Sequence, residues 1–429
     1  MKRIRVPDLL KNPHLWLIIL TIVILALKLA IITVPWPELQ PSDCINPPLK
    51  TECALIFDEA HYIPAVRKIM MGQPANNEHP PLSKALMILG IIVFGDNPIG
   101  WRFFISLCGA ASIYILGRLA VKLTGSWRTG LLAAALFAFD ISSFNLSSIA
   151  MLDAPALVFS LLAALLFLQE RYVFSGLSMG LALLCKTSSL FILLALLVYN
   201  LLEQTHRYDS LAEAFRRWLS VTEKLVFISL AVLLIGLAAY DYGVGAYATP
   251  FEHLDYILNY HSSLTFKEGD NVYMPLSWSN PIKPYPRMPY FVVTVTVDGK
   301  EYHPVAYYGM QTPLWWMTWL VVAMVSYMAY ESLRRRFPSI ETFVLTWIAL
   351  TYFIYFPLAH IVHRWVYPFY FYSTLPIIAA SLPYILEGDR FSELMTYVLL
   401  VVQIAWFIVW FPVKPQWLID FLLALGAPA

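Results

Sequence analysis

Apolar residues in this chain are gathered into long blocks that short polar turns separate. Most blocks approach the roughly 20 residues that an α-helix needs to cross the hydrocarbon core of a bilayer. A spanning segment must satisfy its own backbone hydrogen bonds, so blocks of this length predict helices. We expect an all-α polytopic membrane protein with about eleven transmembrane helices, at 15–34, 101–121, 129–147, 151–169, 172–186, 188–202, 224–246, 312–331, 341–359, 366–386 and 392–411.

Composition supports a membrane-embedded chain. Of the 429 residues, 59% are hydrophobic and 13% are charged, whereas soluble domains carry roughly 25% charged residues. The formal net charge of +1 gives no reason to expect a nucleic-acid partner. Because no internal repeat is evident, we expect residues 1–429 to form one membrane domain.

The distribution of basic residues predicts the orientation of the spans. Residues 15–34 are too long for a signal-peptide core and no small-residue cleavage site follows, so they are expected to form the first span. By the positive-inside rule, Lys2, Arg3, Arg5 and Lys11 then hold the N-terminus in the cytoplasm. With that start, the basic residues of the short turns fall mostly on the inner side: Lys122, Arg128, Arg171, Arg207, Arg216, Arg217, Arg334, Arg335, Arg336 and Arg390.

Two long segments, 35–100 and 247–311, then lie outside the membrane. Within the first, residues 82–95 are apolar but too short to span comfortably, so we expect a helix lying along the outer surface. The second ends in alternating Val and Thr around Asp298-Gly299, which predicts a small β-hairpin.

The first outer segment also holds Cys44 and Cys53. A disulfide between them would fit an oxidising compartment, but their spacing does not decide between a bridge and two free thiols.

An acidic pair in the first outer segment, Asp58-Glu59, is the first candidate for chemistry. One carboxylate at the membrane surface could take a proton from an acceptor hydroxyl. Adjacent helical side chains point about 100° apart, so usually only one of the two can aim at a given atom. The alternative is a helix N-terminal acidic pair that the macrodipole favours.

Downstream, Glu78-His79-Pro80-Pro81 precedes the expected surface helix, whose first turn holds Lys84. A basic residue in the first turn gains nothing from the helix dipole, which favours a nearby anion. Alternatively, the Lys84 side chain extends to lipid phosphates.

Several ionisable residues lie at the outer ends of the predicted spans, where charge is costly and indicates function: Arg102, Asp140, Asp153, Lys186, His360, His363 and Arg364. Arg102, Lys186 and Arg364 could together neutralise a phosphate at the leaflet boundary. Alternatively, each is an interface anchor or the partner of an acid. Asp153 could pair with one of these cations or cap a helix.

Six histidines fall on or near the outer side, which raises the question of a metal: His61, His79, His253, His261, His360 and His363. Their spacing matches no tight zinc motif. We therefore expect no required cofactor, although a divalent metal remains an alternative.

The motifs resemble the protein O-mannosyltransferase family of the GT-C glycosyltransferase class. The matching residues follow one another in order: Phe57-Asp58-Glu59-Ala60-His61, His79-Pro80-Pro81-Leu82-Ser83-Lys84, Trp101-Arg102, Ala150-Met151-Leu152-Asp153, Gly180-Leu181-Ala182, Lys186, Tyr260-His261, and Arg364 before the aromatic run Tyr367 to Tyr372. The acidic pair followed by HPPL is the most specific part. Departures are Asn77, where the family often has an acid, and Ser83, where it usually has glycine.

The resemblance implies a GT-C fold and an inverting transfer of mannose from dolichyl or polyprenyl phosphate mannose to Ser or Thr hydroxyls of exported proteins. It implies Asp58 as the catalytic base with Glu59 positioning the acceptor, and Arg102, Lys186 and Arg364 as ligands of the donor phosphate. Supporting roles in substrate binding are expected for His61, Glu78, His79, Lys84, Asp153, His261 and His363.

The resemblance also implies a multi-pass protein of the cell membrane with an extracytoplasmic site. The second outer segment is too short for the soluble lectin-like domain of eukaryotic members, which favours a prokaryotic or archaeal type. One alternative is a GT-C enzyme that glycosylates a lipid or glycan, such as an aminoarabinose transferase, although those more often carry KPPL than HPPL. Another is a non-enzymatic transporter, which would show inverted repeats.

Overall fold

The structure is a computed structural model that describes residues 12–267, 269–297, 299–335 and 340–426. Lys2, Arg3, Arg5, Lys11, Asp298 and Arg336, which the predictions above used, lie outside these ranges. Within them, six helices are long and apolar enough to cross a membrane: α1 (Pro13–Ile31), α4 (Pro98–Thr124), Thr187–Arg207 with α9 (Leu190–Arg207), α10 (Leu211–Val244), Ile340–His360, and α17 (Arg390–Val409).

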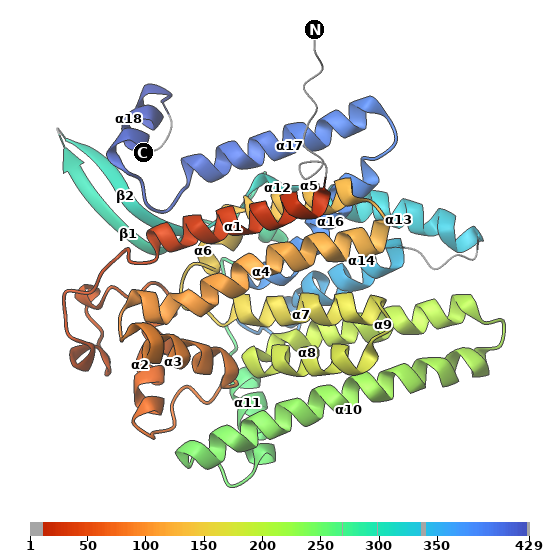
Figure 1. Ribbon diagram of the computed structural model, residues 1–429, viewed down its shortest axis with the longest axis horizontal. Helices are drawn as coiled ribbons and strands as arrows, with labels where there is room; N and C mark the ends of the chain where they lie inside the picture. Colours follow the sequence, from red (N-terminus) through yellow and green to blue (C-terminus); the bar gives the residue numbers. More distant parts are fainter. Residues whose placement is uncertain (1–11, 268, 298, 336–339, 427–429) are drawn as a thin grey trace.

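Shorter apolar helices pack with these long ones in one bundle (Figure 1). They are α3 (Leu82–Phe94), α5 (Trp127–Ala138), α7 (Asp153–Leu168), α8 (Tyr172–Cys185) and α16 (Leu375–Ile385). The predicted helical bundle is therefore confirmed, whereas the number of spans stays a prediction.

Three predicted spans are interrupted. The span at 129–147 is divided into α5 and α6 (Ile141–Leu146), because the buried Asp140 carboxylate caps α6 by accepting from the Ser143 N–H at 2.8 Å. Residues 312–331 begin as the short α12 (Pro313–Trp316) before α13 (Thr318–Arg335). Residues 366–386 begin as a 3₁₀ turn, Pro368–Ser373, before α16.

Residues 203–223, which connect the predicted spans 188–202 and 224–246, are mostly helical. Helix α9 continues to Arg207 and α10 begins at Leu211, after Ser210 has capped it. On α10, Glu213 pairs with Arg216 and Arg217, three and four residues further on. Charges at this spacing stabilise an exposed helix rather than a loop.

The elements of the two outer segments lie at one end of the bundle, opposite the α9–α10 turn (Figure 1). They include α2 (Glu59–Met70), α3, α11 (Pro250–Ser263), and the strands β1 (Met288–Val297) and β2 (Lys300–Gly309). The strands pair antiparallel, which confirms the hairpin. Neither α11 nor α18 (Gln416–Ala424) was predicted.

The predicted short helix at 82–95 is present as α3, and it packs backbone to backbone on the start of α4. A Cβ atom added at Gly90 would lie 1.9 Å from the Gly100 carbonyl oxygen. Only glycine allows this approach. The position of α3 relative to a bilayer stays a prediction.

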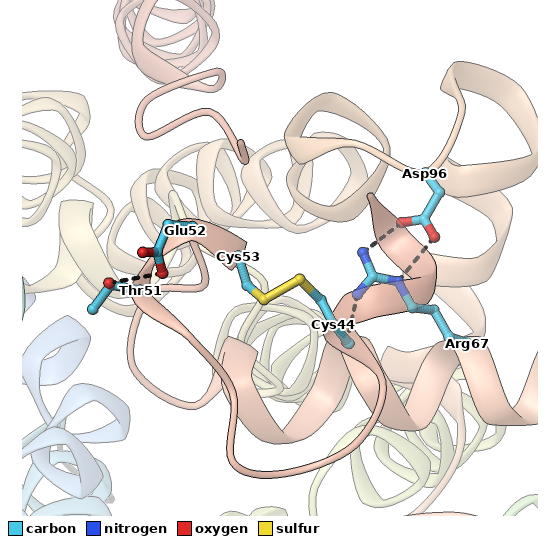
Figure 2. Close-up of a disulfide and its surroundings, with 6 residues drawn as sticks. All are labelled: Cys44, Thr51, Glu52, Cys53, Arg67 and Asp96. Atoms are coloured by element: carbon cyan, nitrogen blue, oxygen red, sulfur yellow. Dashed lines mark hydrogen bonds and ion pairs between the residues drawn. A yellow bond between two sulfur atoms is a disulfide. The ribbon is translucent and has the colours of Figure 1, made fainter. Parts of the chain in front are cut away.

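Within the first outer segment, a disulfide closes the loop before α2, and Arg67 of α2 ties this loop and Asp96 to the helix (Figure 2). Cys44 and Cys53 are bonded, which resolves the choice that their spacing left open. The Arg67 guanidinium donates to the Cys44 carbonyl at 2.7 Å and pairs with Asp96 at 2.9 Å. The loop before the acidic pair is therefore held against α2 and the start of α4.

Candidate active site

A cavity of about 620 Å³ is lined by residues of both outer segments, of the connection between α8 and α9, and of the segment around Arg364. Five of the predicted site residues line it: Asp58, His79, Lys186, His261 and Arg364. The remaining wall is mostly apolar and aromatic: Phe57, Tyr62, Leu190, Phe191, Ile257, Leu258, Tyr260, Leu264, Tyr355, Leu358, Val362, Tyr367, Phe369 and Tyr370, with Thr187, Ser188 and Ser262. Residues far apart in the sequence thus form one polar cluster against an apolar wall.

Asp58 stands at the N-cap position of α2, at the wall of this cavity. The preceding residue, Phe57, has φ of 53°, a left-handed conformation that aromatic residues rarely adopt. Its amide donates to the Tyr290 carbonyl at 3.2 Å, and the two rings stack with centroids 4.3 Å apart. The hairpin therefore holds the turn that presents Asp58 to the cavity.

Burial raises the pKa of the Asp58 carboxyl. The charges of His61 and Lys186 and a hydrogen bond from Tyr62 act in the opposite direction and favour the carboxylate. A carboxyl whose pKa is raised toward neutrality is better suited to accept a proton than an exposed one.

Lys186 is positioned by a break between two helices. Helix α8 ends at Cys185, and Lys186 takes an extended conformation before the 3₁₀ turn Thr187–Ser189. Its ammonium lies 2.7 Å from Asp153 Oδ1 and 5.2 Å from the ring centroids of Phe369 and Tyr370. The Lys186 ammonium therefore lies at the cavity wall, where it is paired with the buried Asp153 and contacts two aromatic rings.

Arg364 reaches the cavity from a segment that the second outer segment holds in place. Residues 264–266 pair with 363–365, through the amides of Phe266 and Trp365 at 2.8 and 2.9 Å. The Arg364 guanidinium donates to His261 Nδ1 at 3.2 Å, and His261 Nε2 donates to the Glu78 carbonyl at 3.0 Å.

His261 acts in this arrangement as a neutral ring. Burial and the neighbouring Arg364 charge lower its pKa to about 4. At neutral pH the imidazole therefore accepts from Arg364 and orients the guanidinium without competing for an anion. Burial likewise lowers the pKa of His79, which is neutral too.

Arg102 and Glu59 do not reach the cavity, contrary to the roles expected for them. Arg102 forms a two-point ion pair with Glu59, at 2.7 Å for both contacts, and donates to the Ala54 carbonyl. Glu59 also accepts from the amides of Ile56 and Ala150. Both side chains are almost fully buried, at 1% and 0% exposure. Since every oxygen of Glu59 is engaged within the fold, we assign this pair a structural role.

The contacts of Lys84 match neither alternative that the sequence left open, a nearby anion or lipid phosphates. Its ammonium is buried and donates to the carbonyls of Asn76 and His79, so it fixes the turn before α3. The Glu78 carboxylate accepts from the Asn76 side chain at 2.7 Å. Both residues support the loop that carries His79, rather than facing the cavity.

The other expected residues lie around the site. His61 is exposed near Asp58, and Asp153 holds Lys186. His363 is absent from the cavity wall, and its ring meets the edge of Phe266. Within the described part of the chain, no group of three or more His, Cys, Asp or Glu residues is placed to hold a metal ion.

Two contributors to the site were missed. Tyr62, four residues after Asp58 on α2, lines the cavity beside it, and the i, i+4 spacing could have indicated this. His253 joins Asp241 at 2.8 Å and the Asn77 carbonyl at 2.9 Å, so it links α10 and α11 to the loop before His79. No local pattern signals a contact across that distance in sequence.

Comparison with known proteins places this geometry in context. A family model described as dolichyl-phosphate-mannose-protein mannosyltransferase matches residues 78–235. The polyprenol-phosphate-mannose–protein mannosyltransferase of Mycolicibacterium smegmatis is 31% identical over 123 residues, 27% of this chain and 24% of that protein. The protein of the same name from Corynebacterium glutamicum is 34% identical over 129 residues, 27% of this chain and 25% of the relative. The match thus spans about a quarter of the length of these relatives, and it confirms the resemblance recognised in the motifs.

Solved structures establish the fold. ArnT from Cupriavidus metallidurans, bound to undecaprenyl phosphate, superposes with a TM-score of 0.51 at 16% identity, over 88% of this chain and 62% of that chain. Archaeal oligosaccharyltransferase AglB from Archaeoglobus fulgidus, in complex with an inhibitory peptide and a dolichol-phosphate, gives 0.50 at 14% identity, over 91% and 56%. The chain is an integral membrane protein with the predicted GT-C fold.

Proposed function

We propose that this protein transfers mannose from a polyprenyl or dolichyl phosphate to Ser or Thr hydroxyls of a polypeptide. The observation that carries the proposal is that one carboxyl, Asp58, and two cations, Lys186 and Arg364, line a single cavity with an apolar wall. The names of the family model and of the curated relatives support mannose as the sugar and a protein as the acceptor.

The cations hold the donor phosphate and stabilise the charge that develops on it. When the bond from the anomeric carbon to the phosphate oxygen breaks, its electron pair remains on the phosphate. Lys186 and Arg364 stabilise that anion. Electrostatic stabilisation of developing charge is usually the largest single contribution to catalysis. Because these two side chains supply positive charge, we propose that this step requires no metal ion or other cofactor.

The lipid part of the donor fits the apolar part of the same wall. Leu190 and Phe191 at the start of α9 face the cavity together with Leu258, Leu358 and Val362. These side chains can bury the first isoprenoid units, since each methylene removed from water contributes about 0.8 kcal/mol. The phosphate would then lie where the apolar wall meets the cations.

Asp58 accepts the proton of the acceptor hydroxyl as the hydroxyl oxygen forms the new bond to the anomeric carbon. Attack and departure on opposite faces of the sugar invert the anomeric centre in a single displacement. Neutral His79 supplies hydrogen bonding at the cavity wall without adding charge. Glu59, Glu78, Lys84 and Asp153 support the loops and cations, and they need not touch the substrate.

The site is proposed to face the extracytoplasmic side of a cell membrane. The two outer segments lie at one end of the bundle, and the α9–α10 turn, with its basic residues, lies at the other. The positive-inside rule places that turn in the cytoplasm. The division into one membrane domain with loops at 35–100 and 247–311 is proposed on the same ground.

The proposal is tested by incubating purified protein with polyprenyl phosphate mannose and a Ser/Thr-rich peptide, followed by mass spectrometry of the peptide. Addition of one hexose is the expected result, and the Asp58→Asn variant should lose most of it. Hexose on a lipid acceptor instead of the peptide would favour the second GT-C activity. No transfer to either acceptor from any polyprenyl phosphate sugar would refute the proposal.

A further inference from the structure

Helix α17 has a broad exposed face of apolar side chains. The helix is long and apolar enough to cross a membrane. Its exposed apolar residues include Leu394, Val398, Val401, Val402 and Ile408. Because the chain is an integral membrane protein, an apolar face of this extent lies against lipid. Helix α17 thus supplies a lipid-facing surface whose continuation can be followed toward the hairpin.

An aromatic cluster surrounds the end of α17 that is nearer the hairpin. The rings of Trp316 and Trp406 meet edge to face with centroids 5.5 Å apart, and Tyr308 meets Trp410 in the same way at 6.0 Å. The Arg287 guanidinium lies 4.6 Å from the ring centroid of Trp410. The four rings are partly exposed, and Arg287 is exposed. Tryptophan and tyrosine gather where the bilayer meets water, and arginine extends its charge from there, so the cluster indicates the level of the membrane surface.

The chain between α17 and α18 is fixed to the hairpin. The Ala306 amide donates to the Pro412 carbonyl, and the Lys414 amide donates to the Pro304 carbonyl, both at 2.8 Å. Helix α18 begins directly afterwards at Gln416, and Figure 1 shows it beside the hairpin. Helix α18 is therefore held close to the aromatic cluster and to the membrane surface that the cluster indicates.

Helix α18 has two apolar faces, of which only one is covered by the protein. The covered face consists of Leu418, Ile419 and Leu422, which are buried. The other face is a stripe of side chains at four-residue spacing, which places them above one another on a helix. The stripe consists of Trp417, Phe421 and the C-cap residue Leu425, which are 69%, 51% and 65% exposed. Three large apolar side chains together on one short helix indicate a contact surface.

The third face of α18 is polar but carries no positive charge. Gln416 donates to the Asp420 carboxylate at 2.9 Å, and residues 416–425 contain neither Lys nor Arg. Attraction to an anionic surface therefore cannot drive binding, which leaves burial of the apolar stripe. Lipid is the occupant that the surroundings favour, because the stripe follows the aromatic cluster and continues the lipid-facing surface of α17.

We propose that α18 is an interfacial membrane anchor whose stripe inserts among the lipid headgroups and holds the hairpin at the membrane surface. The hairpin in turn accepts the Phe57 amide at the Tyr290 carbonyl, so the anchor also steadies the turn that carries Asp58. This inference goes beyond the proposed function and does not depend on it, since it holds whatever sugar or acceptor the site takes.

Nitroxide labels on two faces of α18 test the insertion. Trp417→Cys and Asp420→Cys are labelled one at a time in a Cys108→Ser background, in nanodiscs of phosphatidylcholine alone. The label at 417 should collide mainly with oxygen, which concentrates in lipid, and the label at 420 mainly with a water-soluble nickel chelate. Equal access of the nickel chelate to both positions would place the stripe in water and overturn the anchor. Protection of position 417 from both reagents would overturn it too, because a second copy or another polypeptide would then cover the stripe.

Hydrogen exchange of the hairpin amides tests the consequence. In the same nanodiscs, Phe421→Gln should speed exchange of the β2 amides near Val305 about tenfold, as expected when an aromatic side chain loses its apolar surroundings. Leu423→Gln is the matched control, because Leu423 is 44% exposed but lies on the opposite side of the helix from Phe421. It should leave the exchange near that of the parent protein. Equal effects of the two variants, or no effect of Phe421→Gln, would contradict an anchor that acts on the hairpin.

Discussion

Replacing Asp58 by asparagine separates catalysis from folding in this protein. The two side chains have nearly the same volume, and Tyr62 can bond to either. The cost to stability is therefore at most that of one altered hydrogen bond, about 0.5–1.5 kcal/mol. Loss of a general base reduces the rate by about 10²–10⁴. The activation barrier should thus rise by about 3–5 kcal/mol, well above the change in stability.

Three measurements on Asp58→Asn give the result: transfer to a peptide, binding of polyprenyl phosphate, and the melting temperature. Transfer should fall by two to four orders of magnitude, while binding and melting remain near those of the parent protein. Lys186→Met is the control, because it should weaken the binding of polyprenyl phosphate, which Asp58→Asn should leave unchanged. An Asp58→Asn protein that transfers mannose at the parent rate would refute the assignment of the base.

The pH dependence follows from the same environment. Because burial raises the pKa of Asp58, the carboxyl is protonated over a wider acidic range than an exposed aspartate, and only its ionised form can accept a proton. Transfer should therefore be lost as pH falls through the raised pKa and be restored as pH increases. The residual activity of Asp58→Asn should lack this step; if the step persists, another group titrates.

Three further predictions concern neighbouring residues. Glu59→Gln leaves the buried charge of its arginine partner uncompensated, so the protein should lose about 3–5 kcal/mol of stability, seen as a lower melting temperature; unchanged melting would contradict the structural role. Lys186→Met and Arg364→Met should each raise KM for the donor about tenfold or more, as loss of a charge-assisted contact does, and polyprenyl phosphate titration checks this; unaltered binding in both would exclude a phosphate site. Cys44→Ser opens a disulfide between residues nine apart, which should cost about 2–3 kcal/mol; a Cys44→Ser, Cys53→Ser double variant that matches the single confirms the bridge as the cause.

The helices of the bundle and the β-hairpin could be predicted from regular patterns of apolar residues in the sequence. Apolar blocks of bilayer length gave the helices of the bundle, and Val/Thr alternation gave the hairpin. The interruptions could not be predicted in the same way. Asp140 divides a span because Thr312, far away in sequence, also donates to its carboxylate, and a local pattern contains no information on that partner.

The same limit applies to the site. Motif and position placed Asp58, Lys186 and Arg364 together, and they line one cavity. Arg102 has the same residue type and a similar position at a span end, yet its charge is paired with Glu59 inside the fold. Whether a cation lines a cavity, as Lys186 does although it is paired with Asp153, or is enclosed within the fold depends on tertiary contacts, so composition and spacing cannot distinguish the two cases.

The pairing of residues 264–266 with 363–365 limits how this protein could be engineered. Chimeras that exchange the second outer segment between relatives are an obvious way to change which polypeptide is modified. Here that segment also holds the backbone beside Arg364, so a graft that removes Thr265 or its neighbours would displace a cation of the candidate site. Successful exchanges should therefore begin after residue 266 and retain the helix that precedes it.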